Sequence, residues 1–271
     1  MSSFQYTALI RTHNSFPLVA EVVEKLRAQT FPPAMILAVD SASSAEQRLS
    51  LEKVFDQVID YPNEPFNYSK AINIGVEACQ TEYVLIISSH VVMQSEIMIQ
   101  KALGVIKYEK TNCLGFCLCA TTNPDKLWSE QKIDTQNFSP AIGLSNSCAF
   151  LKVKPILNRP FREDVFSAED QEWASYYLRK HNAYFFGILS YHLKYINQHM
   201  NDLKKINEEI SMAYFTHQQL RSPKNITLRV IRAALALVRN RPNRAKLHII
   251  LAKELFLSYF RKPVRKSSYY K

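Results

Sequence analysis

Short apolar runs that alternate with segments of helical spacing organise the first 110 residues of this chain. Apolar runs of strand type are expected at residues 6–10, 35–39, 55–60 and 83–88. Helical spacing follows them at residues 15–28, 44–53, 69–79 and 95–108. Strands and helices that alternate in units of about 30 residues predict a parallel sheet with right-handed crossovers. The predicted fold class is therefore α/β, with a Rossmann-like, mostly parallel central sheet flanked by helices.

The pattern changes after residue 119. Residues 121–140 are polar and irregular, which is typical of a loop over the functional face of such a sheet. Regular elements are expected again as a strand within 142–153, a helix at 168–180 and a last core strand at 184–189. From residue 200 the spacing is helical to the end, with Pro223 and Pro242 as breaks. We predict two regions: an α/β domain over 1–199 and a helical, basic region over 200–271.

The net charge of +10 is unevenly distributed along the chain. Residues 219–271 contain fourteen Lys or Arg and a single acid, Glu254, whereas residues 1–218 contain 20 basic and 23 acidic side chains. A polycationic end of this kind favours an acidic surface: phospholipid headgroups, a nucleic acid or a partner protein. No zinc-finger or RNA-recognition signature accompanies the charge, so we expect no nucleic acid.

The C-terminal helices favour a membrane surface among these partners. Residues 226–238 are apolar, with Arg229, Arg232 and Arg239 on one stripe of a helical wheel. A basic helix with an apolar back lies well on an anionic bilayer. The alternative is that these helices pack on the α/β domain. No apolar window of about 18 residues predicts a spanning helix, and the first ten residues lack the pattern of a signal peptide. We expect a cytoplasmic protein, peripheral on the inner face of the cell membrane.

The cysteines agree with that compartment. They are five in number, with no Cys-x-x-Cys spacing, and three of them lie in the apolar run at 113–119. Reduced, buried thiols in a cytoplasmic protein are the expected state.

Polar residues follow two of the predicted strands, where an open α/β sheet binds its ligands. Asp40 follows the second strand and can accept hydrogen bonds from a nucleotide base or ribose, although it can also cap the next helix. No glycine fingerprint precedes it, which disfavours a dinucleotide site. Ser88-Ser89-His90 follows the fourth strand. The His90 imidazole could hold Mn²⁺ against a diphosphate; the alternative is a histidine that is only hydrogen-bonded at the sheet edge.

Acids and histidines further along the chain complete the candidate set. Glu169-Asp170 opens the helix at 168–180, where acids often only complement the helix dipole. In the functional interpretation Asp170 faces the cleft and takes a proton from an attacking hydroxyl. His192 and His199 follow the last core strand, and either is a candidate second metal ligand or a packing histidine.

Together these segments resemble the family 2 glycosyltransferases, whose fold is called GT-A. The resemblance runs from about residue 7 to residue 192, through TALIRTHN at 7–14, AQTFPP at 28–33, the strand that ends at Asp40, FNYSKAINIG at 66–75 and AED at 168–170. It implies a GT-A domain over 1–199 that takes a UDP-, dTDP- or GDP-linked sugar and transfers it, with inversion, to a glycan or lipid-linked acceptor, as in bacterial surface polysaccharide synthesis.

The same resemblance implies roles for individual residues. Asp40 corresponds to the residue that contacts the base, and Asp170 to the catalytic base. Ser88-Ser89-His90 stands where the family has Asp-x-Asp, so one negative charge is missing, and a Mn²⁺ or Mg²⁺ ion is expected on His90, with His192 as the second ligand. Lys70 is the nearest cation to a position that is often arginine, which is Ile72 here, and Lys70 or Arg11 could assist the leaving diphosphate. The donor-binding set is then Thr12, Asn14, Asp40, Lys70, Ser88, Ser89 and Glu169.

Two further readings of the chain differ in class. A nucleotidyltransferase of related fold would open with a glycine-rich loop, and residues 11–14, Arg-Thr-His-Asn, contain no glycine. A non-catalytic module that binds nucleotide sugars or glycans, with a degenerate metal motif, is the stronger alternative, because Ser88 replaces an aspartate.

Overall fold

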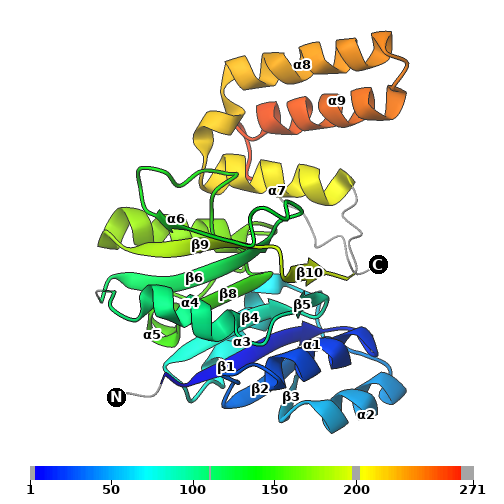
Figure 1. The fold of residues 1–271 in the computed structure, drawn as a ribbon. Coiled ribbons are helices and arrows are strands. Elements are labelled where there is room, and N and C mark those ends of the chain that lie inside the picture. Colours follow the sequence, from blue (N-terminus) through cyan, green and yellow to red (C-terminus); the bar gives the residue numbers. More distant parts are fainter. Residues whose placement is uncertain (1–3, 110, 197–201, 264–271) are drawn as a thin grey trace.

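The structure is a computed structural model, and it describes residues 4–109, 111–196 and 202–263 (Figure 1). Eight strands of the described chain form one sheet in the order β3-β2-β1-β4-β8-β6-β9-β7, and β5 with β10 form a small second sheet. The strands are β1 (Tyr6–Thr12), β2 (Met35–Asp40), β3 (Gln57–Asp60), β4 (Tyr83–Ser88), β5 (Val91–Met93), β6 (Cys113–Ala120), β7 (Trp128–Ile133), β8 (Cys148–Lys152), β9 (Tyr184–Ser190) and β10 (Leu193–Tyr195).

The first half of the sheet is parallel, as predicted. β1 pairs with β2 on one side and with β4 on the other, and β2 pairs with β3. The strands are buried on both faces: Ala8 and Ile10 lie in one apolar cluster and Leu9, between them, lies in the other. Side chains of successive strand residues point to opposite faces, so an uninterrupted apolar run is required here.

Helices cover both faces of the sheet. α1 (Leu18–Arg27), α2 (Ala45–Val54) and α4 (Met98–Ile106) contribute to one cluster, and α3 (Tyr68–Glu77), α5 (Val153–Asn158) and α6 (Glu169–His181) to the other. Gly75 allows α3 to approach β1 closely, because a Cβ there would lie 2.2 Å from a methyl carbon of Leu9. A glycine inside this predicted helix is therefore a packing requirement.

The second half of the sheet is mixed. β8 runs antiparallel to both β4 and β6, whereas β6 and β9 are parallel. β7 forms the antiparallel edge, so the prediction of an irregular loop over 121–140 is wrong for residues 128–133. Four of the six β7 residues are exposed and polar. Edge strands commonly carry such polar residues, and they remove the apolar alternation by which a strand is predicted from sequence.

The C-terminal helices stack at one end of the molecule, beyond the sheet (Figure 1). They are α7 (Asp202–Phe215), a 3-10 turn (Gln218–Arg221), α8 (Pro223–Val238) and α9 (Pro242–Leu257). Pro223 and Pro242 stand in the first turns of α8 and α9, where the missing N–H costs no hydrogen bond. α7 contacts α6 and α9, and α9 contacts α8.

Two observations on the described residues bear on the expectations about the chain as a whole. Every helix there is too short or too polar to cross a bilayer. The five cysteines are free thiols, of which Cys113, Cys117 and Cys148 are buried and Cys79 and Cys119 are half-buried.

Candidate active site

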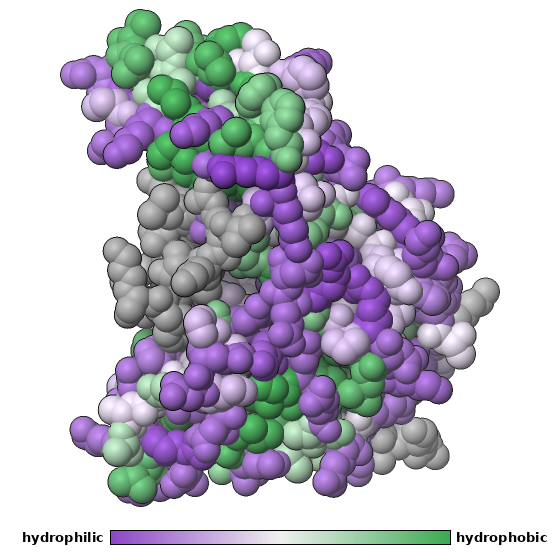
Figure 2. Space-filling model, turned by 180° about the vertical axis from the view of Figure 1, so that it is seen from behind, coloured by the Kyte–Doolittle hydropathy of each residue, from purple (hydrophilic) through white to green (hydrophobic). Residues whose placement is uncertain are grey.

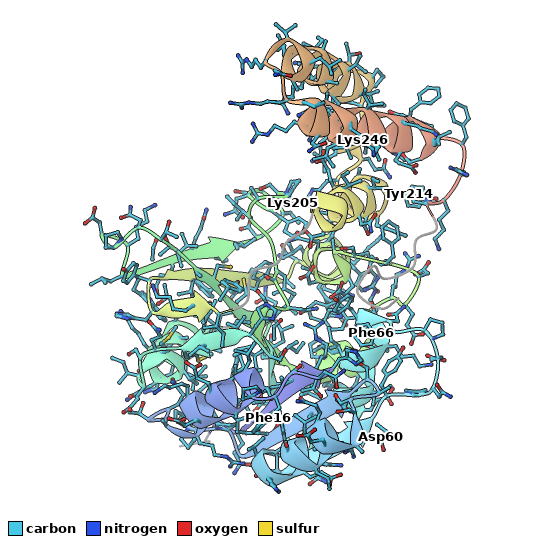
Figure 3. The ribbon with its side chains drawn as sticks, turned by 90° about the vertical axis from the view of Figure 1, so that its right-hand side faces the viewer. Phe16, Asp60, Phe66, Lys205, Tyr214 and Lys246 are labelled. Carbon is cyan, nitrogen blue, oxygen red and sulfur yellow. The ribbon has the colours of Figure 1, made fainter. Side chains whose placement is uncertain are left out.

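The carboxyl ends of β1, β2 and β4 meet at one edge of the sheet, with β1 in the middle. Thr12 stands opposite Asp40, and Arg11 opposite Ser88. Strand order reverses around β1, which is where open α/β sheets bind ligands. Figure 3 views the molecule from the side at which these strands end.

Asp40 is buried at this edge and held by hydroxyl and amide donors. The Thr12 hydroxyl donates to its Oδ1 over 2.8 Å, and the Ser43 hydroxyl over 2.6 Å. The Ser43 N–H donates to Oδ2 over 3.1 Å. A carboxylate has about four acceptor positions, so Oδ2 keeps capacity for a donor on a ligand. The structure brings Thr12 and Asp40, two of the predicted donor-binding residues, into direct contact.

Asn14 connects the two loops that leave β1 and β2. Its backbone N–H donates to the Ser43 hydroxyl over 2.8 Å, and its side-chain oxygen accepts the Ser44 N–H over 2.9 Å. Asn14 and Ala42 both have positive φ, at 45° and 55°. Such conformations cost free energy for residues other than glycine and concentrate at functional sites. The amide of Asn14 fixes the rim of the site from within the loops.

Arg11 is the cation that the structure places beside the end of β4. One of its terminal nitrogens lies 3.5 Å from the Ser88 hydroxyl oxygen and donates to the backbone oxygen of Asn146 over 3.3 Å. Its guanidinium also lies over the Tyr68 ring, 5.3 Å from the centroid. A planar guanidinium fixed on several sides suits recognition of phosphate oxygens.

Asp170 reaches the same edge from the first turn of α6. Its Oδ2 accepts the Asn146 N–H over 2.9 Å, and its Oδ1 accepts the N–H of Gln171 over 2.8 Å. Burial raises the pKa of Asp170 to about 7, with the nearby charge of Glu169 as the second cause, while the two backbone donors act against the rise. A carboxyl group with a pKa near neutrality can take up a proton during a reaction and release it afterwards.

Glu169 is buried next to Asp170 and faces Asn146. The Asn146 side-chain nitrogen lies 3.4 Å from a carboxylate oxygen of Glu169. Ala168, which precedes the pair, has φ 60° and ψ 36°, in the left-handed region. This backbone turn sets the direction in which α6 begins, and so the direction of both carboxylates.

His90 is connected to this edge through Tyr195. The two ring centroids are 6.1 Å apart, and the Tyr195 hydroxyl lies 3.0 Å from that of Ser147. The Ser147 backbone oxygen accepts the N–H of Ser88 over 3.0 Å. Because Ser147 follows Asn146, His90 and Asp170 belong to one continuous set of contacts at one edge. Ser88, Ser89 and His90 are all half-buried.

Other predicted site residues are not brought to this cluster. The Lys70 ammonium forms an ion pair with Glu64 at 2.6 Å. His192 is exposed, and it lies at the opposite end of the small sheet from His90. The backbone N–H of Gln94 donates to the backbone oxygen of His192, whereas the backbone N–H of Ile196 donates to that of His90. Four strand residues span roughly 13 Å, which is too far for a shared ion that needs both rings within about 2.1 Å. His199 lies outside the described residues.

The donor atoms at the β4 end fit a divalent ion only in company with a ligand. Among the described residues no group of three or more His, Cys, Asp or Glu side chains comes together. Among the described residues, the His90 imidazole and the Ser88 and Ser89 hydroxyls are the candidate donors that follow β4. Mg²⁺ and its analogues in phosphate-transferring sites are commonly bound by one or two side chains together with substrate phosphates. The set fits an ion that arrives with a diphosphate.

Sequence reasoning missed Asn146, Ser147 and Tyr195. The first two precede β8, an antiparallel strand, so they reach the carboxyl edge of the parallel strands from a strand's amino end. Tyr195 is in the three-residue strand β10. Nothing in their local spacing distinguishes them from ordinary loop and strand residues.

Residues 7–163 match the family described as glycosyl transferase family 2. That match covers more than half of the chain, and the chain belongs to this family.

Solved structures share the fold at low sequence identity. The mannosyltransferase PcManGT from Pyrobaculum calidifontis, in complex with GDP-Man and Mn²⁺, is similar with a TM-score of 0.62 and 14% identity, over 96% of this chain and 88% of that one. S. aureus TarS 1–349 is similar with a TM-score of 0.57 and 15% identity, over 94% and 90%. Glucosyl-3-phosphoglycerate synthase from Mycobacterium tuberculosis, with Mn²⁺, UDP and phosphoglyceric acid, gives 0.58 and 10%, over 78% of each chain. No curated protein matches the chain.

Proposed function

We propose that this chain is an inverting glycosyltransferase that moves a sugar from a nucleotide-diphosphate sugar to a hydroxyl group of a glycan or lipid-linked acceptor. The observation that carries the proposal is Asp170: a half-buried carboxyl group with its pKa raised to about 7, at the edge that also holds Asp40 and Arg11. Membership of the family and neighbours solved with GDP-Man, UDP and UDP-GlcNAc support a nucleotide-sugar donor.

In the proposed reaction Asp170 is the general base. Its carboxylate takes the proton of the acceptor hydroxyl while that oxygen bonds to the anomeric carbon. The bond from the anomeric carbon to the diphosphate breaks on the opposite side, and the nucleoside diphosphate leaves with the electron pair. A single displacement of this kind inverts the anomeric centre and needs no covalent enzyme intermediate.

The donor is proposed to lie along the ends of β2, β1 and β4. Asp40 accepts a hydrogen bond from the base or ribose, within a frame set by Thr12 and Asn14. Arg11 stabilises the charge that grows on the diphosphate, because a fixed cation in a partly dry site acts strongly on developing charge. Lys70 contributes less to this stabilisation, because its ammonium group is paired with Glu64.

His90, with Ser88 and Ser89, would hold a divalent cation that arrives with the diphosphate. A bound Mn²⁺ or Mg²⁺ ion supplies charge neutralisation at the leaving oxygens. His90→Ala is then expected to weaken UDP or GDP binding in Mn²⁺ more than in EDTA. Equal affinities of the variant and the native protein under both conditions would remove His90 from this role.

We propose that the enzyme acts at the surface of an anionic membrane, where a growing surface glycan or a lipid-linked acceptor is found. The fourteen Lys or Arg residues within 219–271 support it.

The test of the activity combines donor screening with product analysis. UDP-, GDP-, dTDP- and CMP-sugars are added with and without Mn²⁺, and one class is expected to raise the melting temperature of the protein. Transfer from that donor to glycan fragments, followed by NMR, should give a product of inverted anomeric configuration. A retained configuration contradicts the single displacement.

The alternative is a module that binds nucleotide sugars without catalysis. The observation in its favour is Ser88, which puts a hydroxyl where a carboxylate would help to hold a metal. Donor binding without any transfer or donor hydrolysis in Mn²⁺ would establish it.

A further inference from the structure

The helix α8 reverses the usual distribution of apolar side chains. The residues that it buries are Ala233 and Ala236, and it packs against α9. Ile226 packs against the cluster formed by α7 and α9, but the other large aliphatic side chains of α8 face solvent. We call these residues the α8 outer face: Leu228, Val230, Ile231, Leu235, Leu237 and Val238. Val238 is 84% exposed and Leu237 57%. A surface helix normally turns its aliphatic stripe toward the core.

The α8 outer face is broad and continuous. At 3.6 residues per turn its members cover roughly half of the helix circumference. Apolar residues of α9 and the turn after it are also exposed: Ile249, Phe256, Tyr259 and Phe260. Figure 2 shows apolar side chains gathered over these terminal helices, with hydrophilic residues between and below them. Exposed apolar patches of this extent mark a surface that another body covers.

The helices that carry the apolar surface are strongly basic. Residues 222–263 contain ten Lys or Arg and one acid, Glu254. Arg229 is paired with Glu209 of α7. The pKa of His248, which lies on α9, is lowered by burial first and then by the charges of Arg229, Arg232 and Arg244. A neighbouring histidine therefore experiences a local excess of positive charge.

We propose that the α8 outer face docks on an anionic lipid bilayer. Its aliphatic side chains enter the boundary between headgroups and acyl chains, and Lys and Arg side chains of the same helices reach toward the lipid phosphates. This inference rests on the proposed function, because it names the surface that would bring the proposed enzyme to a membrane-borne acceptor.

Charge and shape favour a bilayer over other occupants. We call α8 and α9 together the α8–α9 hairpin. A second copy of the chain would bring two of these strongly basic hairpins together, and their positive charges would repel each other. α8 is the outermost element of the hairpin (Figure 1), so its apolar face is convex. A convex apolar face on a strongly basic pair of helices matches a plane that is apolar inside and phosphate-coated outside.

The test is flotation of the full chain with vesicles of phosphatidylcholine, alone or mixed with phosphatidylglycerol. The native protein is expected to float with the anionic vesicles, and added salt is expected to weaken the binding. The variant Ile231→Ser, Leu235→Ser, Val238→Ser should bind them roughly tenfold or more weakly, because less apolar surface enters the bilayer.

A matched variant removes the same number of exposed aliphatic side chains elsewhere: Leu49→Ser, Leu127→Ser and Leu157→Ser. Each of these leucines is at least 48% exposed, and all lie outside the hairpin. This control is expected to float like the native protein. The proposal is overturned if both triple variants bind alike. It is also overturned if, without lipid, the native chain self-associates and only the α8 variant is monomeric, because a second copy then covers the face.

Transfer to a soluble acceptor fragment, measured without vesicles, separates this proposal from the glycosyltransferase proposal. The α8 variant should keep that transfer while it loses flotation. A native chain that floats but transfers no sugar contradicts the enzyme activity and leaves membrane docking supported. A chain that transfers sugar but does not float contradicts docking alone.

Discussion

The carboxyl edge of the sheet and the α8 outer face depart from ordinary burial in opposite senses. At the edge, Asp40 and Glu169 are buried although charged groups favour water. On α8, aliphatic side chains are exposed although burial would stabilise the fold. Stability of the isolated chain explains neither region. We infer that each region is maintained because it binds something outside the chain. The carboxyl edge binds a charged, polar ligand, and the α8 outer face binds a lipid surface.

The two regions also differ in how far other groups of the protein offset the cost of a buried carboxylate or an exposed aliphatic side chain. Within the described residues, three donors reach Asp40, whereas Asp170 accepts two backbone N–H groups and has Glu169 as a neighbour. The raised pKa of Asp170 shows that its compensation is partial. The exposed aliphatic residues of α8 have no counterpart within the described chain that covers them. Substitutions at the carboxyl edge should therefore alter the rate of sugar transfer, whereas substitutions on the α8 outer face should alter only the binding of the protein to membranes.

The largest expected effect is that of Asp170→Asn on sugar transfer. The amide cannot take up the acceptor proton, so turnover should fall about 10²-fold or more. Donor affinity, measured by calorimetry, should stay within a factor of about two, because Asp170 is not proposed to hold the nucleotide. Asp125→Asn, at an exposed loop carboxylate, serves as the control and should transfer normally. Near-normal transfer by the Asp170 variant would assign the base elsewhere.

A smaller loss is expected for Arg11→Met. Removal of the guanidinium beside Ser88 takes away positive charge from the leaving diphosphate and should lower kcat by roughly 10- to 100-fold. Arg11→Lys keeps the charge but loses the planar fork and should lie between the native enzyme and Arg11→Met. Single-turnover measurements with saturating donor test this order. If methionine and lysine give equal rates, charge at this position does not matter to the chemical step.

The pH dependence provides a third test at the same edge. A carboxylate base is active when ionised, so kcat/KM should fall as the pH drops below about 7, the pKa of Asp170. Glu169→Gln removes the neighbouring negative charge, lowers the pKa of Asp170 and should move the acidic limb to lower pH by roughly half a unit to one unit.

Glu208→Gln on α7 is the graded control, because the charge of Glu208 is the last of the causes that raise the pKa of Asp170. Its shift should have the same direction and be smaller. An acidic limb that moves to higher pH in either variant contradicts the assignment of Asp170 as the group that titrates.

The sequence allowed one half of this site to be predicted and left the other half unrecognised. Asp40 and Ser88 follow uninterrupted apolar strands, and a parallel strand places the residue after it at a known edge. Asn146 and Ser147 precede β8, and no local spacing tells that this strand runs antiparallel. The helical pattern of α6 indicated an acidic first turn, but whether Asp170 is solvated or half-buried depends on packing against residues 145–147.

The same limit applies to the elements themselves. Strands β1, β2 and β4 are apolar on both faces and were predictable, whereas β7 is a polar edge strand and was missed. For α8, amphipathic spacing was visible in the sequence. The direction of its apolar side was not, because that depends on the small residues Ala233 and Ala236 that allow it to pack on α9.

The smallest expected effect concerns the backbone that precedes Asp170. Ala168 has φ 60°, and an L-residue with a Cβ loses about 1–2 kcal/mol in this region. Ala168→Gly removes that strain but adds freedom to the unfolded chain, which costs about 0.5–1 kcal/mol. The net result should be a gain of up to about 1.5 kcal/mol in the free energy of unfolding, measured by urea denaturation at constant m-value.

Asn182→Gly is the matched change at the other end of α6, where φ is 48°. Asparagine tolerates the left-handed region better than alanine, so this variant should gain less stability. It should also leave kcat unchanged, since it lies at the end of the helix away from the carboxyl edge. Ala168→Gly should lower kcat a fewfold, because a glycine there lets Glu169 and Asp170 depart from their present directions. Equal effects of both variants on kcat would mean that Ala168 is strained for folding alone, and that the edge is not held in place by its backbone.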